Sequence, residues 1–145
     1  MCAKFPDTPV VIDHFARIGV DGKIRDEQVK QLCALAKFKN TYLKVSAFYA
    51  LGKKQPPYTD LIPMIRRAYD AFGPKRLMWG SDSPYQLDGE NTYEASIDLV
   101  RKGLKFLTDR DRQSLLRVDP SSTAFRLSPV PHGPTAQRPS SSILH

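Results

Sequence analysis

Apolar residues along the chain fall into two alternating kinds of segment. Three short apolar runs each follow a phenylalanine and a polar turn, in FPDTPVVIDH (5–14), FKNTYLKVSA (38–47) and FGPKRLMWGSD (72–82). Short apolar runs bounded by turn residues are typical of buried strands. After each run comes an amphipathic segment in which apolar residues recur at helical spacing. These amphipathic segments predict helices over 26–38, 60–72 and 92–107.

The order of these elements predicts the fold class. Strand, loop and helix alternate three times, and such alternation favours parallel strands joined by helical crossovers. Capping residues mark two helix starts, because Asn91 with Glu94 and Thr108 with Asp111 have the spacing of a capping box. We therefore expect an α/β fold.

The last part of the chain lacks this periodicity. Residues 119–145 contain five prolines and six serines. A segment of this composition cannot bury enough apolar surface to offset the conformational entropy that folding removes. The sequence thus predicts a folded domain over 1–117 and a disordered Pro/Ser-rich tail over 118–145.

Composition and charge narrow the function classes. The 145 residues suffice for one domain, and a hydrophobic content of 41% is typical of a globular protein. The net charge is +7, but basic residues are scattered beside acidic ones, so we expect no nucleic-acid partner. Two cysteines form no disulfide framework, and no apolar stretch resembles a signal peptide or a membrane span. We expect a cytoplasmic protein with no membrane partner.

The ends of the three predicted strands carry polar residues. The first strand runs into His14, the second ends at Ser46, and the third runs into Asp82. In parallel α/β folds the carboxyl ends of the strands meet at one rim, where functional side chains converge. Because side chains alternate along a strand, we expect His14 to share a face with Val10 and Ile12.

Each of these residues also has a structural interpretation. His14 could hydrogen-bond to a loop carbonyl, and Asp82 could cap its own loop. Lys44, in the middle of the second strand, must be paired or functional, because burying an unpaired ammonium costs several kcal/mol. Asp13 and Asp82 are its candidate partners. Candidate substrate contacts just beyond the strand ends are Arg17 and Tyr49.

Three stretches together resemble a known family. VVIDHFARIG, YLKVSAFYA and RLMWGSDSPY, in this order and at these intervals, are similar to the last three βα units of the amidohydrolase-related family. That family is a TIM-barrel group of metal-dependent hydrolases and lactonases. The resemblance covers residues 1–117 and implies three consecutive βα units from the C-terminal part of a (β/α)8 TIM barrel. The KVS sequence is most similar to that of lactonase-type members.

The resemblance also implies roles for individual residues. Asp82 corresponds to the family's eighth-strand aspartate, which ligates a divalent, zinc-like metal or acts as a general base on water. His14 corresponds to the sixth-strand histidine, which polarises or protonates the scissile group. Lys44 and Ser46 lie on the seventh strand, where substrate contacts are expected. The implied reaction is hydrolysis, in which water attacks the carbonyl of a lactone, an amide or a related small molecule.

The sequence departs from the family pattern in its histidines. Family members carry an H-x-H on the first strand and a further histidine on the fifth, whereas this chain has only His14 outside its tail. A catalytic zinc takes three protein ligands, so the implied metal site of Asp82 and His14 is incomplete. We therefore expect a truncated family member that binds no stoichiometric zinc and is inactive alone. The alternative is a non-catalytic interaction module or gene remnant, which self-associates or pairs with another subunit through its open sheet edges.

Overall fold

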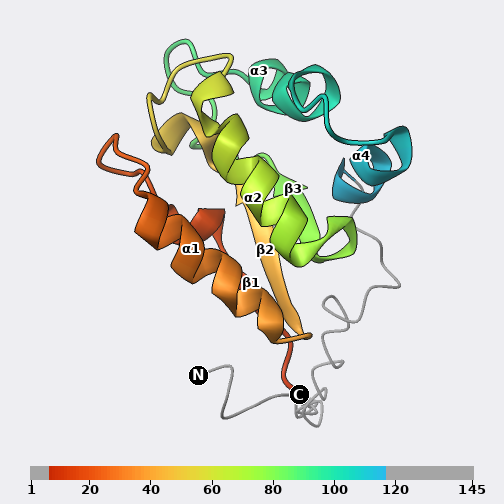
Figure 1. Cartoon of the computed structure of the whole chain (residues 1–145). Coiled ribbons are helices and arrows are strands. Elements are labelled where there is room, and N and C mark those ends of the chain that lie inside the picture. Colours follow the sequence, from red (N-terminus) through yellow and green to blue (C-terminus); the bar gives the residue numbers. More distant parts are fainter. Residues whose placement is uncertain (1–6, 117–145) are drawn as a thin grey trace, which may run out of the picture.

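The computed structural model describes residues 7–116 (Figure 1). Its strands and main helices are β1 (Val10–Ile12), α1 (Asp26–Ala34), β2 (Thr41–Ser46), α2 (Ile62–Phe72), β3 (Leu77–Gly80), α3 (Tyr93–Asp98) and α4 (Asp109–Leu116). This alternation confirms the predicted α/β class. None of the helices in this range is both long and apolar enough to cross a bilayer. The predicted tail over 118–145 lies outside the described residues.

The strands form one parallel sheet in the order β1-β2-β3. Ile12 of β1 pairs with Leu43 of β2, and Ser46 at the end of β2 pairs with Gly80 at the end of β3. Because the strands run in the same direction, the segments that follow them emerge at one edge of the sheet. Within residues 7–116, β1 and β3 each pair with β2 alone, so their outer edges are open.

The core lies between the sheet and the pair α1 and α2, which lie side by side over it (Figure 1). Leu43 and Val45 of β2 are fully buried, as is Ile65 on the apolar stripe of α2. Burying each such side chain contributes about 1.5–3 kcal/mol. On the other face of the sheet Ser46 is buried, but the remaining side chains are partly exposed, and these are Val11, Tyr42, Lys44 and Met78. The sheet therefore has one covered face and one more open face.

The predicted helix over 92–107 is interrupted. α3 ends at Asp98 and continues as a wide turn over Leu99–Gly103, in which the Leu104 N–H donates to the Leu99 carbonyl at 2.9 Å. A Cβ atom at Gly103 would lie 2.8 Å from the Leu99 Cδ1 methyl group, so a larger residue at this position would displace the Leu99 side chain. The helical spacing of apolar residues continues across this point, which is why the pattern predicts one helix.

One predicted cap is confirmed and the other is wrong. At the start of α4, the Asp111 N–H donates to the Thr108 hydroxyl oxygen, and the Thr108 N–H donates back to the Asp111 carboxylate. This reciprocal pair is the predicted capping box. At the start of α3 the cap is Thr92, whose hydroxyl oxygen accepts from the Ala95 N–H. Asn91 instead accepts a hydrogen bond from the Tyr58 hydroxyl at 2.7 Å.

Candidate active site

The chain turns sharply where β1 ends. Asp13 is extended, and the four residues from His14 to Arg17 all have positive φ, between 46° and 61°. Left-handed backbone costs about 1–2 kcal/mol per non-glycine residue, so other interactions must hold this turn. The Ala16 N–H donates to the Asp13 carbonyl at 2.8 Å, and the Phe15 ring is fully buried.

This turn sets the direction of His14. Ile12 pairs with the buried Leu43 and faces the helices, whereas His14 contacts Ser46, which alternates onto the other face of β2. The prediction that His14 shares a face with Ile12 is therefore wrong. The left-handed backbone, and not strand alternation, brings the imidazole over the end of β2.

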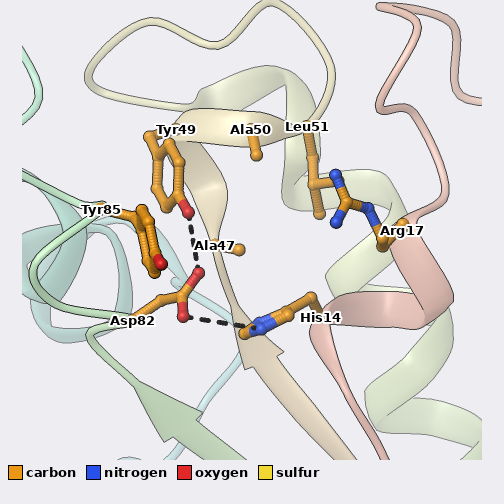
Figure 2. A pocket seen from close by; sticks show the side chains of 8 residues that line it. All are labelled: His14, Arg17, Ala47, Tyr49, Ala50, Leu51, Asp82 and Tyr85. Carbon is orange, nitrogen blue, oxygen red and sulfur yellow. Dashed lines mark hydrogen bonds and ion pairs between the residues drawn. The ribbon is translucent and has the colours of Figure 1, made fainter. Parts of the chain in front are cut away.

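Left-handed residues also redirect the chain after the other two strands. Ala47, directly after β2, has φ 58° and leads into a single 3₁₀ turn over Phe48–Ala50 that carries Tyr49. Asp82, two residues beyond β3, itself has φ 58°. Backbone outliers of this kind concentrate at functional sites. Each of the three strand ends thus presents a polar side chain to the same region (Figure 2).

His14, Ser46, Tyr49 and Asp82 form one contact network. His14 Nδ1 lies 2.7 Å from Ser46 Oγ, and His14 Nε2 lies 3.6 Å from Asp82 Oδ1. The Tyr49 hydroxyl donates to Asp82 Oδ2 at 2.8 Å. Because Nε2 also lies 3.6 Å from the Asp13 carboxylate, we place the imidazole proton on Nε2 and let Nδ1 accept from the Ser46 hydroxyl.

A cavity of about 420 Å³ opens beside this network (Figure 2). The polar side chains that line it are His14, Arg17, Tyr49, Asp82 and Tyr85. Tyr85 is 70% exposed and is not among the site residues predicted from the sequence. Its only sequence signal is its position three residues after Asp82, in the same loop.

The predicted substrate contacts occupy different places. Arg17 and Tyr49 line the cavity. Ser46 is 1% exposed and reaches the site through His14. Lys44 Nζ lies 2.9 Å from Asp13 Oδ1, so Lys44 pairs with one of its two candidate partners. Lys44 is half-buried on the open sheet face, so its pairing with a carboxylate satisfies the ammonium without a substrate.

The environment of Tyr49 keeps its hydroxyl protonated. Burial, the hydrogen bond to Asp82 and the charge of that carboxylate together raise the pKa of Tyr49 to about 12, against a lowering effect of Arg17. At neutral pH the phenol is therefore a permanent donor to Asp82 and cannot serve as a base. The arrangement offers a carboxylate base, an N–H donor and a phenol donor around one cavity.

The residues present do not make a divalent metal site. A catalytic zinc needs three protein ligands, and no group of three metal-ligating side chains occurs within the described part of the chain. His14 and Asp82 are the two candidates that face each other, and one Asp82 oxygen already accepts from Tyr49.

The sequence profile of the amidohydrolase family matches residues 1–117. The chain is 29% identical over 119 residues to a 4-sulfomuconolactone hydrolase from Hydrogenophaga intermedia, a match that covers 81% of this chain and 39% of that protein. It is 30% identical over 81 residues to an L-fucono-1,5-lactonase from Burkholderia ambifaria, covering 56% of this chain and 28% of the relative. The chain thus spans well under half the length of these relatives.

Solved structures also match this chain over part of their length. An amidohydrolase from Burkholderia multivorans with bound zinc superposes with a TM-score of 0.65 at 25% identity, over 79% of this chain and 43% of that one. An Acinetobacter baumannii protein, described as a probable 2-pyrone-4,6-dicarboxylic acid hydrolase with citric acid bound, gives a TM-score of 0.64 at 27% identity, over 86% and 47%. The sequence and structural matches agree, and the chain belongs to the amidohydrolase family.

Proposed function

We propose that this chain supplies one sector of a hydrolase active site, in which water attacks the carbonyl of a lactone or amide. The observation that carries the proposal is the meeting of His14 and Asp82, from two different strand ends, with 3.6 Å between Nε2 and Oδ1 at a shared cavity. A carboxylate and an imidazole at this separation can act on one water or substrate oxygen. The lactone-hydrolysing relatives support this reaction class.

The steps follow from the donors and acceptors at the site. Asp82 takes a proton from a water molecule while the water oxygen bonds to the carbonyl carbon. The His14 Nε2–H donates to the oxyanion that develops, as a preorganised donor at such a position lowers the barrier by several kcal/mol. When the ring carbon–oxygen bond breaks, the leaving oxygen takes the proton from the Asp82 carboxyl group. The product of a lactone is then a hydroxy acid.

Substrate contacts in this proposal come from the cavity wall. The Arg17 guanidinium carries planar donors that suit a carboxylate or carbonyl oxygen of a substrate. That Lys44 and Ser46 contact the substrate stays a prediction, since Lys44 pairs with Asp13 and Ser46 hydrogen-bonds to His14. The remaining walls of the site would come from further βα units of a TIM barrel, as the resemblance implies.

A second candidate function rests on the sheet. The open edges of β1 and β3, and the half-exposed Val11 on the more open face, suit an interaction module that pairs with another subunit. In this case the chain would form a complex without turning over a substrate.

One experiment separates the two candidates. The 145-residue chain is assayed for proton release from 4-sulfomuconolactone and L-fucono-1,5-lactone, alone and co-expressed with the part of the Hydrogenophaga intermedia relative that lies outside the match. We expect hydrolysis only from the complex. A complex without hydrolysis favours the interaction module, and a chain that neither assembles nor hydrolyses, by light scattering and assay, contradicts both.

We expect the purified chain to bind no stoichiometric zinc, because the described residues provide two ligands where three are needed. The check is metal analysis after dialysis against micromolar zinc, with and without a chelator. A chelator-sensitive ion at one equivalent per chain, lost in the His14→Ala variant, would show that the ligand count is wrong.

A further inference from the structure

The Tyr49 hydroxyl connects two loops that are distant in sequence. Tyr49 follows β2 and Asp82 follows β3, and their side chains meet at 2.8 Å. Each loop contains a non-glycine residue with left-handed backbone, which is Ala47 in one and Asp82 in the other. Strained backbone persists only where the surrounding structure holds it, and it is concentrated at functional sites.

The two oxygens of Asp82 have different neighbours. Oδ1 faces His14 Nε2, and Oδ2 accepts from Tyr49 (Figure 2). The Asp82 side chain borders the cavity of about 420 Å³, so without a partner on Oδ2 it has room to change rotamer. A hydrogen bond to a charged group is among the stronger ones in proteins, so Tyr49 is well suited to fix this carboxylate.

We propose that Tyr49 is a positioning residue, whose hydroxyl holds Asp82 in the rotamer that directs Oδ1 toward His14 and the cavity. The proposal rests on the proposed function of Asp82, but the orientation itself is measurable without turnover. Tyr49 also stays protonated across the neutral range, since burial and the neighbouring carboxylate raise its pKa to about 12. Its donor role is therefore constant wherever the enzyme would work.

The competing interpretation makes Tyr49 a substrate contact only. In that case the Tyr49→Phe variant binds substrate less tightly but leaves Asp82 in place. Phenylalanine keeps the ring and its packing and removes only the hydroxyl. The matched control is Tyr69→Phe, which removes a similar hydrogen bond, from Tyr69 to Asp111 at 2.9 Å, away from the cavity.

The first measurement is the set of NMR scalar couplings across the Asp82 Cα–Cβ bond in the 145-residue chain. We expect couplings of one rotamer in the unmodified chain and in Tyr69→Phe, and averaged couplings in Tyr49→Phe. Unchanged couplings in Tyr49→Phe would overturn the proposal. This readout requires no substrate, so it stands whether or not the chain is part of a hydrolase.

The second measurement is kinetic and uses the complex described above. Tyr49→Phe is expected to lower kcat by about ten- to a hundredfold with KM within twofold, the pattern of a lost transition-state interaction. Adding Tyr49→Phe to Asp82→Asn should cost little more, because the two residues act as one unit. A raised KM with unchanged kcat identifies a substrate contact and contradicts the positioning role. Absence of turnover in every form contradicts the proposed function instead. The scalar couplings then decide by themselves whether Tyr49 positions Asp82.

Discussion

Replacing Asp82 with asparagine is expected to lower kcat/KM of the assembled hydrolase by about a hundred- to ten-thousandfold. A positioned general base contributes a factor of this size, and the amide of asparagine cannot accept the proton of the attacking water. Asp82 is the carboxylate that faces both His14 and the cavity, so we expect no other side chain in the described residues to replace it.

The fold should survive this substitution. Asparagine keeps the size of aspartate and an oxygen that accepts from the Tyr49 hydroxyl. Circular dichroism and thermal unfolding of the variant check this point. The matched control is Asp88→Asn, an exposed aspartate in the same loop, which should hydrolyse the lactone at the normal rate. Near-normal turnover by Asp82→Asn would remove Asp82 from the mechanism.

Replacing Phe48 with alanine is expected to reduce the free energy of unfolding by about 3–5 kcal/mol. The Phe48 ring is fully buried in the core, 5.9 Å from the ring of Tyr58. Its loss leaves a cavity that the surrounding side chains fill only in part. For a domain with a total stability of about 5–15 kcal/mol, this is a large fraction. Urea denaturation followed by tryptophan fluorescence measures the difference.

A comparison with an exposed residue makes the Phe48 result specific. Leu87 is 60% exposed, so Leu87→Ala should change the free energy of unfolding by no more than about 0.5 kcal/mol. Phe48→Leu, which keeps most of the apolar volume, should fall between the two. If Phe48→Ala lowers the free energy of unfolding by less than about 1 kcal/mol, the packing of this ring contributes little to the stability of the core.

The fold was largely predictable because its signals are local or periodic. The alternation of apolar runs and amphipathic segments predicts three βα units along the chain, and the three strands are parallel as predicted. The capping box at Thr108 and Asp111 is equally local and is confirmed. The interruption of the predicted helix after Asp98 was missed because the helical spacing of apolar residues continues across it.

The sequence predicted which residues form the candidate site better than it predicted how they are oriented. His14 and Asp82 were found because they follow apolar strands, and both line the cavity. The direction of His14 was wrong, since four successive left-handed residues override strand alternation and none of them is glycine. The hydrogen bond between Tyr49 and Asp82 could also not be predicted from the sequence, because it joins two loops that are distant in sequence.

The turn after β1 bears on any attempt to transplant this pair of residues into another parallel sheet. A histidine placed at the end of a regular strand would point along the direction that alternation dictates, which here is the wrong face. The graft must therefore include the segment 13–18, with Phe15 buried and the Ala16 and Ile18 amides bonded back along the chain. In a host protein whose core has no space for the Phe15 ring, the turn would not form and the histidine would point in another direction. The segment to transfer is therefore the whole turn and not the histidine alone.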